Sequence, residues 1–273
     1  MITNLNIGNN GRLGNQLFQY AICFAVAKEL NTDFIIPEEN LLHESLFVKC
    51  RLYELFNLKT KTKKKLIVDN VFKEPSNIED NIINYDYENL IYNIPNNTSI
   101  EGWFQSYKCF IKYERELKEQ LLIHENITYK AKQILEKINQ KEIVNIHFRR
   151  GDYVKEYNSL FYLNDIDYIN KALTYFNGDY NFFITSDDIE WCKYTFSEYK
   201  NFYFSNSSND LLDFALMSLC NHNIISNSTF SWWAAFLNKN INKKVIMPSK
   251  WIKRDIPNKV WIKNLLLENW VII

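Results

Sequence analysis

The sequence predicts an α/β protein whose second half is a parallel β-sheet covered by helices on both faces. From Glu142 onward, apolar runs of strand length alternate with stretches of helical periodicity. Polar clusters follow several of these runs. The 273 residues, 47% of them apolar, suffice for one large domain or for two of about 130 residues each. This apolar content excludes an intrinsically disordered protein.

The first half of the chain is less regular. We predict a strand at residues 2–7, a turn that contains glycine, and a helix from about Asn15 to Leu30, where apolar residues recur at helical intervals. Residues 31–140 mix short strands with polar loops, and a predicted helix at 128–139 closes this half.

The second half alternates regularly, and we place a domain boundary near Lys141, which gives domains of residues 1–140 and 141–273. The predicted pairs of strand and helix are residues 143–148 with 165–176, 181–185 with 188–196, 201–204 with 209–220, and 223–226 with 230–237, followed by a strand at 245–247. Because neighbouring parallel strands need a long crossover connection, usually a helix, this alternation favours a parallel sheet.

Charge and composition limit the classes of partner. Basic and acidic residues balance at 32 each, so no net charge attracts the protein to nucleic acid or to a membrane. The basic segment from Lys59 to Lys65 is a local exception. We interpret it as a solvated loop or helix end; weak attachment to anionic lipid is the alternative. We expect no nucleic-acid partner and at most peripheral membrane contact.

The cysteine pattern and the apolar runs bear on location. The five cysteines are widely spaced and form no C-x-x-C pair, which indicates neither a zinc site nor a disulfide framework. No signal peptide is recognisable, and the longest apolar runs are too short to cross a bilayer. We therefore expect no transmembrane segment and a location in the reducing cytoplasm.

Polar side chains follow three of the predicted strands at the point where each strand ends. The sequence R-R-G-D begins at Arg149, directly after the strand that carries His147. Asp187 follows the next strand, and a hydroxyl-rich segment from Ser226 to Thr229 follows a later one. Because the carboxyl ends of parallel strands meet at one edge, where open sheets bind ligands, we expect these groups to form a site.

The chemistry of these groups suits a nucleoside diphosphate. Ser226, Ser228 and Thr229 lie at a predicted helix N-terminus, where free N–H groups and the helix dipole favour an anion. The guanidinium groups of Arg149 and Arg150 are suited to fork onto phosphate oxygens. Taken alone, the hydroxyl-rich segment is more often a helix cap, and the R-R-G-D turn is as often a surface loop.

Asp213 is a second clue, because this carboxylate lies beside the apolar stripe of a predicted helix and needs a hydrogen-bond donor. Guanine offers two adjacent donors that one carboxylate can accept. The alternative is a solvated residue at the edge of the stripe.

The sequence indicates no metal site. The four histidines are scattered without ligand spacing, and Asp187 with Asp188 is the pair best suited to Mg²⁺. Since the two arginines already supply positive charge, we expect no metal and no other cofactor.

Five segments resemble the α-1,2-fucosyltransferase family, in the family's order and over nearly the whole chain. They are G-R-L-G-N-Q-L-F-Q-Y-A from Gly11, E-G-W-F-Q-S from Glu101, H-F-R-R-G-D-Y from His147, F-I-T-S-D-D from Phe183, and I-S-N-S-T-F-S-W-W-A-A from Ile225. Each motif alone is weak, but five in order are specific.

The resemblance implies a GT-B-like fold of two Rossmann-like domains facing across a cleft, with the second binding the donor GDP-β-L-fucose. It implies an inverting reaction that places fucose on O2 of a terminal galactose of a glycan. By the same resemblance, Arg149 binds the β-phosphate, and further donor-side residues are Asn15, Gln16, His147, Asp213, Ser228 and Thr229. The positions at strand ends add Arg150, Asp187 and Ser226 to the predicted donor site.

The resemblance leaves the proton acceptor and the acceptor glycan open. Asp152, Glu101 and Glu156 are the candidates for a catalytic base, and a good leaving group makes a dedicated base dispensable. Aromatic residues next to two of the motifs, Trp103 among them, are candidates for stacking on sugars, although core packing is the more common role. Cys109 departs from the family pattern close to the E-G-W-F-Q-S segment.

Three alternatives remain at this point. A related transferase would use another GDP-sugar, linkage or acceptor, and a noncatalytic relative would bind glycans without needing GDP. A kinase or NTPase would need a G-x-x-x-x-G-K-[ST] loop, which the sequence lacks.

Overall fold

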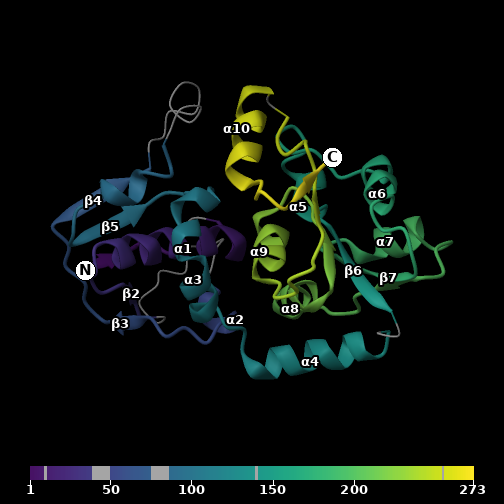
Figure 1. Ribbon diagram of the computed structural model, residues 1–273, viewed down its shortest axis with the longest axis horizontal. Helices are drawn as coiled ribbons and strands as arrows, with labels where there is room; N and C mark the ends of the chain where they lie inside the picture. Colours follow the sequence, from purple (N-terminus) through teal and green to yellow (C-terminus); the bar gives the residue numbers. More distant parts are fainter. Residues whose placement is uncertain (9–10, 39–49, 75–85, 139–140, 254) are drawn as a thin grey trace. The chain divides into compact units, whose positions relative to one another are not determined.

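The computed structural model describes residues 1–8, 11–38, 50–74, 86–138, 141–253 and 255–273. The chain forms two compact units, coloured by sequence in Figure 1. Unit 1 comprises residues 1–123 with 259–265, and unit 2 comprises residues 124–258 with 266–273.

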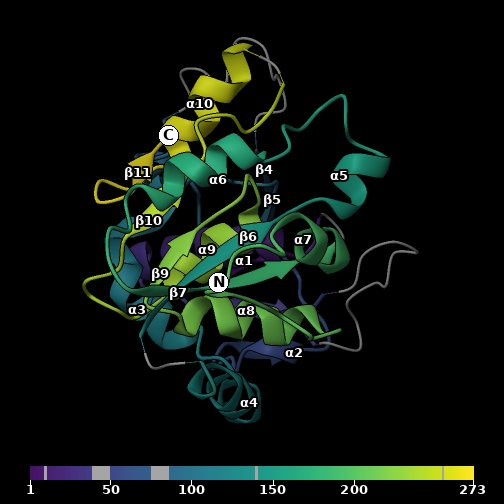
Figure 2. The ribbon, with the colours of Figure 1, turned by 90° about the vertical axis from the view of Figure 1, so that its right-hand side faces the viewer.

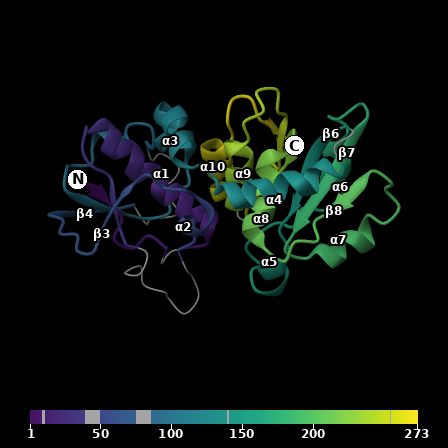
Figure 3. The ribbon, with the colours of Figure 1, turned by 90° about the horizontal axis from the view of Figure 1, so that it is seen from below.

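The boundary of unit 2 lies at His124 rather than near Lys141. The reason is helix α4 (Glu125–Glu136), which packs against α8 (Asp210–Leu219) of unit 2. Figure 3 shows α4 running alongside α8. Its apolar side chains Ala131 and Leu135 are buried, so α4 covers unit 2.

Unit 1 contains two small parallel sheets. In the larger, the strand order is β1-β5-β4, with β1 at Ile2–Thr3, β5 at Thr98–Glu101 and β4 at Asn70–Lys73. In the smaller, β2 (Ile35–Pro37) pairs with β3 (Lys61–Lys63).

Two predictions for unit 1 differ from the structure. Strand β1 ends at Thr3 instead of residue 7, because the backbone then turns and the Asn4 side chain accepts a hydrogen bond from the Asn6 N–H at 2.9 Å. The basic segment is solvated as predicted, but part of it is a strand, β3. The ammonium of Lys61 lies 2.7 Å from the carboxylate of Asp33.

Helix α1 (Leu13–Glu29) is the centre of unit 1 and is buried on nearly all sides. Its run of apolar residues has only a few polar interruptions, which is typical of a helix enclosed by other elements. The remaining helices of unit 1 are α2 (Leu52–Leu55), the 3-10 turns η2 (Leu90–Tyr92), η3 (Tyr107–Cys109) and η4 (Ile111–Tyr113), and α3 (Glu114–Gln120).

Unit 2 contains a six-stranded sheet in which every pairing is parallel, with the order β11-β10-β9-β6-β7-β8. Its strands are β6 (Glu142–Phe148), β7 (Tyr180–Ser186), β8 (Phe202–Phe204), β9 (His222–Ile224), β10 (Val245–Met247) and β11 (Val271–Ile272). The predicted parallel sheet is therefore confirmed, and β11 is an addition to it.

Helices connect these strands and cover both faces. They are α5 (Gly151–Lys155), α6 (Ile166–Leu173), α7 (Ile189–Thr195), α8 and α9 (Thr229–Leu237). Helix α10 (Asp255–Leu265) follows β10 in the chain, and its residues from 259 onward belong to unit 1. Figure 2 shows α6 above the sheet and α4 with α8 below it. Side chains from β6, β7, α6 and α7 form one buried apolar cluster, which includes Phe148, Ile169 and Phe196.

The strand order identifies a topological switch point. After β6 the chain builds β7 and β8 on one side, and it then returns to place β9, β10 and β11 on the other side. This is the 3-2-1-4-5-6 order of Rossmann-like sheets, which bind ligands beyond the carboxyl ends of the strands where the order reverses. The switch point here lies between β6 and β9. No helix among the described residues is both long enough and apolar enough to span a bilayer.

Candidate active site

The loops that follow β6 and β9 meet at the switch point. His147, on β6, places its Nδ1 atom 2.8 Å from the hydroxyl oxygen of Ser226, which follows β9. The Tyr153 hydroxyl, from α5, donates a hydrogen bond to the carbonyl oxygen of Asn227 at 3.1 Å. The R-R-G-D loop and the start of α9 are thereby tied together by two contacts.

Arg149 is held by two carboxylates, one from its own segment and one from the loop that follows β7. Its two terminal nitrogens lie 2.7 Å from Oδ1 of Asp152 and 2.7 Å from Oδ2 of Asp187. Burial acts to raise the pKa of Asp187, but the charge of Arg149 and the backbone N–H groups of Arg150 and Gly151 outweigh it and hold the pKa below its usual value. Arg149 is thus fixed at the carboxyl edge of the sheet, beside the loop that follows β7.

Gly151 permits this close approach. A Cβ atom at this position would lie 2.8 Å from Oδ2 of Asp187, nearer than a carbon and a carboxylate oxygen can pack. A larger residue would therefore displace the carboxylate that holds Arg149.

Arg150 faces a different element. Its Nε lies 3.1 Å from Oδ2 of Asp188, and its guanidinium carbon lies 3.6 Å from the ring centre of Trp191 on α7. Its backbone N–H donates to Asp187 at 2.8 Å. The structure therefore stacks Arg150 against α7 and does not join it to the segment from Ser226 to Thr229.

His147 is a buried, neutral imidazole at neutral pH. Burial lowers the pKa of His147 to about 4, with the charge of Asp187 opposing this shift and the charge of Arg149 adding to it. The ring centre lies 5.9 Å from that of Phe230 at the start of α9. The imidazole therefore offers hydrogen-bonding nitrogens without a positive charge.

The N-terminus of α9 is capped in the manner that its sequence indicates. Ser228 is the N-cap, and its hydroxyl accepts a hydrogen bond from the N–H of Phe230 at 3.3 Å. The side chain of Asn227 donates to the carbonyl oxygens of Tyr162 and Trp251, each at 2.8 Å. These contacts fix the loop from which Ser228 and Thr229 present the helix N-terminus.

Asp213 lies on α8 and is buried. Its Oδ1 accepts a hydrogen bond from the hydroxyl of Ser205 at 2.5 Å. Burial raises the pKa of Asp213 to about 7; the bond from Ser205 opposes this shift, and the charge of Asp210 adds to it. Ring contacts link this helix to the switch point, because Phe214 lies 5.2 Å from Phe230. The solvated alternative for Asp213 does not hold.

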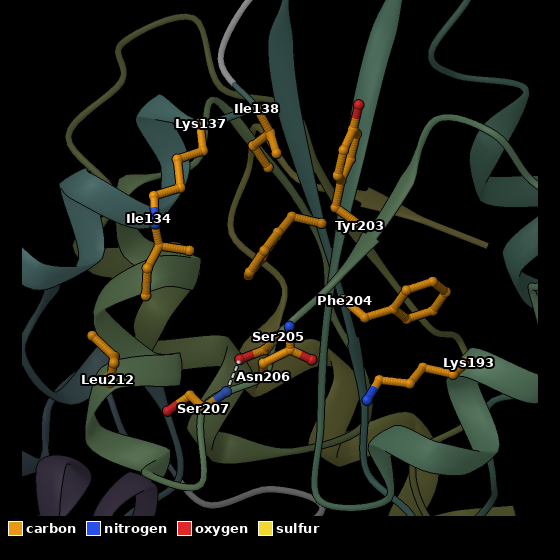
Figure 4. Close-up of a pocket in the computed structure, with 11 residues that line it drawn as sticks. Ile134, Lys137, Ile138, Lys193, Tyr203, Phe204, Ser205, Asn206, Ser207 and Leu212 are labelled. Carbon is orange, nitrogen blue, oxygen red and sulfur yellow. Dashed lines mark hydrogen bonds between the residues drawn. The ribbon is translucent and has the colours of Figure 1, made fainter.

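A cavity of about 690 Å³ opens beside Asp213 on the edge of the sheet (Figure 4). It is lined by Ile134, Lys137, Ile138, Phe183, Lys193, Tyr203, Phe204, Ser205, Asn206, Ser207 and Leu212. Ser205 is its only lining residue with a hydrogen bond to a predicted site residue among the described contacts. The cavity lining includes none of Arg149, His147 and Ser228, so we do not place the reaction there.

Three predicted residues lie in unit 1. The Asn15 side chain accepts a hydrogen bond from Gln105 at 2.7 Å. Gln16 is buried, donates to the Gly11 carbonyl at 3.1 Å and accepts from the Arg51 N–H at 2.9 Å. Glu101 ends β5 and is half-buried. That these residues approach Arg149 remains a prediction.

Three residues of unit 2 that contact the predicted site residues were not themselves predicted: Ser205, Tyr153 and Trp191. Ser205 follows a strand as the other polar clusters do, so the same rule would have found it. Tyr153 and Trp191 act through packing and through contacts with distant segments, for which the sequence carries no signal. In the part of the chain that the structure describes, no three His, Cys, Asp or Glu side chains gather as metal ligands.

Comparisons with known proteins identify the family of the chain. The chain matches the family model "Glycosyl transferase family 11" over residues 2–273. It is 31% identical to an alpha-1,2-colitosyltransferase of Escherichia coli over 277 residues, 90% of this chain and 91% of that protein. It is 29% identical to galactoside 2-alpha-L-fucosyltransferase SEC1 of Bos taurus over 246 residues, 85% of this chain and 63% of that protein.

A solved structure supports the GT-B-like α/β fold. The chain is similar to fucosyltransferase NodZ from Bradyrhizobium with a TM-score of 0.58 and 13% sequence identity, covering 85% of this chain and 91% of NodZ. Because the family model matches from the second residue to the last, the chain belongs to glycosyl transferase family 11.

Proposed function

We propose that this glycosyltransferase transfers L-fucose from GDP-β-L-fucose to O2 of a terminal galactose of a glycan, with inversion to an α-1,2 linkage. The observation that carries the proposal is the contact between His147 and Ser226, which brings the Arg149 loop to the N-terminus of α9 at the switch point. Membership of family 11 and the 29% identity to a galactoside 2-alpha-L-fucosyltransferase support it.

In this proposal the diphosphate of the donor lies between Arg149 and the N-terminus of α9. Bond cleavage leaves negative charge on the β-phosphate of GDP. The guanidinium of Arg149 and the partial positive charge at the N-terminus of α9 stabilise that charge in a position fixed before the reaction. Thr229, as the first residue of the helix, adds a hydroxyl close to the same anion.

Asp213 and His147 read the guanine base. The ionised carboxylate accepts from N1–H and the exocyclic amine, while the neutral imidazole adds a hydrogen bond without repelling a base. Ser205 leaves Oδ2 of Asp213 available, because its own bond goes to Oδ1. Adenine has no matching pair of donors.

Asp152 is committed to Arg149 by an ion pair of 2.7 Å, so we assign it to holding that arginine. Glu101, at the carboxyl end of β5, remains the proposed proton acceptor for the galactose hydroxyl. Arg150 and Asp187 hold the loop around Arg149 through their contacts with each other and with Trp191.

We also propose that transfer requires no metal ion. The positive charge that a diphosphate needs is supplied by Arg149, and the helix N-terminus adds N–H groups. We propose the reducing cytoplasm as the location, which agrees with the buried, free thiols of Cys23, Cys109, Cys192 and Cys220.

The test is a transfer assay with GDP-fucose and lactose, in which the linkage of the product is read by NMR. The expected product is α-1,2-fucosyllactose. Release of GDP without a fucosylated product across a panel of galactosides, or another linkage, overturns the proposal.

A second candidate donor is GDP-colitose, favoured by the 31% identity to an alpha-1,2-colitosyltransferase. Colitose is fucose without the hydroxyl at C3. The ratio of kcat/KM for the two donors decides between them, because a site built for the C3 hydroxyl discriminates strongly against its absence.

A further inference from the structure

The larger sheet of unit 1 also has a carboxyl edge with polar and aromatic groups. Strands β1, β5 and β4 are parallel, so the segments that follow them lie at the same edge. These segments carry Gly11, the turn at 102–104, and Glu74. Such an edge is where open parallel sheets bind ligands.

Glu74 holds the turn at 102–104 from inside the unit. Its Oε2 accepts hydrogen bonds from the backbone N–H groups of Trp103 at 2.6 Å and Phe104 at 3.0 Å. Its Oε1 accepts from the hydroxyl of Tyr87 at 2.9 Å. A Cβ atom on Gly102 would lie 2.3 Å from the Cβ of Glu74, so the contact requires glycine there.

The backbone that Glu74 holds is strained. Phe104 has a φ of +44°, in the left-handed region that a bulky side chain rarely occupies. The Phe104 ring is fully buried and stacks with Phe72 at 6.5 Å between ring centres. This conformation turns two neighbouring aromatic residues in different directions, since Phe104 enters the core while Trp103 stays at the surface.

Trp103 is 46% exposed, the largest exposed fraction of any tryptophan whose side chain the structure describes. The position of its ring is constrained by the neighbouring backbone. A Cβ atom on Gly11 would lie 2.6 Å from Cζ3 of Trp103, so the ring rests against the glycine backbone. Two residues further on, the side chain of Gln105 donates a hydrogen bond to that of Asn15 at 2.7 Å. An aromatic ring that is supported on one side and open on the other suits the apolar C–H face of a pyranose.

We propose that Trp103 is the stacking platform for the galactose ring of the acceptor, and that Glu74 is the positioning residue that keeps the turn at 102–104 in the conformation that exposes it. This inference rests on the proposed function and deepens it by assigning the acceptor to named side chains of unit 1. It assigns no role to Trp103 in donor binding.

The test of the platform uses equilibrium binding of lactose and of N-acetyllactosamine in the presence of saturating GDP. Trp103→Ala is expected to weaken galactoside binding about tenfold or more, while Trp103→Phe keeps most of it and both variants retain wild-type GDP affinity. Tyr194→Ala is the matched control, because Tyr194 is an aromatic residue that is 86% exposed on α7. It should bind galactosides as the wild type does.

The test of Glu74 compares two substitutions. Glu74→Gln keeps an oxygen that accepts both N–H groups, so it should bind lactose nearly as the wild type does. Glu74→Ala should weaken lactose binding with unchanged GDP affinity, and this loss should vanish in a Trp103→Ala background, because the residue acts through the ring.

The outcomes are distinct. Wild-type lactose affinity in Trp103→Ala, or a wild-type protein that binds GDP but neither galactoside, overturns the platform. Additive losses from Glu74→Ala and Trp103→Ala overturn the positioning role. Failure of the proposed function shows separately, as a wild-type protein that binds these ligands but transfers no fucose.

Discussion

His147 Nδ1 lies 2.8 Å from the hydroxyl of Ser226, and this contact joins the two strands between which the sheet of unit 2 reverses its order. The two residues are 79 positions apart in the chain. Their contact places the arginine loop that follows β6 beside the helix N-terminus that follows β9.

Arg149→Ala should lower kcat/KM for transfer by about 10²–10³-fold, since it removes a positioned charge from the leaving diphosphate. Arg149→Lys keeps the charge but not both bonds to Asp152 and Asp187, and it should recover part of the activity. Steady-state kinetics and the Tm of each variant are the measurements. Near-wild-type turnover in a folded Arg149→Ala protein would refute the phosphate role.

Arg150→Ala should affect stability more than chemistry, because Arg150 stacks on Trp191 and pairs with Asp188. Its Tm should fall while kcat, measured below that Tm, stays much closer to wild type than that of Arg149→Ala. A larger loss of kcat in Arg150→Ala than in Arg149→Ala would reverse the assignment of the two arginines.

Asp213→Asn should weaken GDP binding by more than tenfold and leave pyrophosphate binding unchanged, since only the base contacts this residue. Because the pKa of Asp213 is about 7 and guanine binds the ionised form, GDP affinity of the wild type should rise from pH 5.5 to pH 8. Calorimetric titrations with both ligands over this range are the measurement. Equal losses for GDP and pyrophosphate contradict base recognition.

Asp213 and His147 should give opposite pH dependence of stability. The folded pKa of Asp213 is raised to about 7, so its contribution to the free energy of unfolding declines as pH rises between about 4 and 7. The folded pKa of His147 is lowered to about 4, so its contribution to the free energy of unfolding grows as pH rises between about 4 and 6.5. For each residue, the free energy of unfolding changes by at most about 1.4 kcal/mol per pH unit.

Urea unfolding at a series of pH values separates the two contributions. Relative to the wild type, Asp213→Asn should gain stability as pH rises from 4.5 to 6.5, and His147→Gln should lose it over the same interval. Parallel pH profiles for the wild type and both variants would show that neither group has the shifted pKa.

Transfer activity should survive EDTA, because Arg149 and the N-terminus of α9 supply the groups that hold the diphosphate. The assay compares initial rates after chelation and after readdition of Mg²⁺ or Mn²⁺. Loss of activity on chelation that either ion restores would count against a donor site built on arginine.

The sequence was sufficient to predict much of the fold of unit 2 and to predict that several of its polar groups lie together. Alternation of strand and helix implies parallel strands, and parallel strands bring the groups that follow them to one edge, so Arg149, Asp187 and Ser226 were identified from their positions alone. The strand order was not predictable in this way. Which strands lie side by side depends on long-range packing, and this decides that Arg149 faces Asp187 while Arg150 faces Trp191.

Several features of unit 1 could not be predicted from the local sequence pattern. The lysines of β3 carry no apolar alternation, and this strand exists because its backbone pairs with β2. Glu74 was missed because its partners are backbone N–H groups 29 and 30 residues away, which no side-chain pattern encodes. The amphipathic helix α4 was recognised, but the unit that it covers was not, since its apolar face fits either one.

In the proposed donor site, the two carboxylates that hold Arg149 also bear on the release of GDP. Asp152 and Asp187 each lie 2.7 Å from the guanidinium, and their negative charge would oppose that of a diphosphate bound to it. We therefore expect both carboxylates to compete with GDP for Arg149 and to favour its dissociation after transfer.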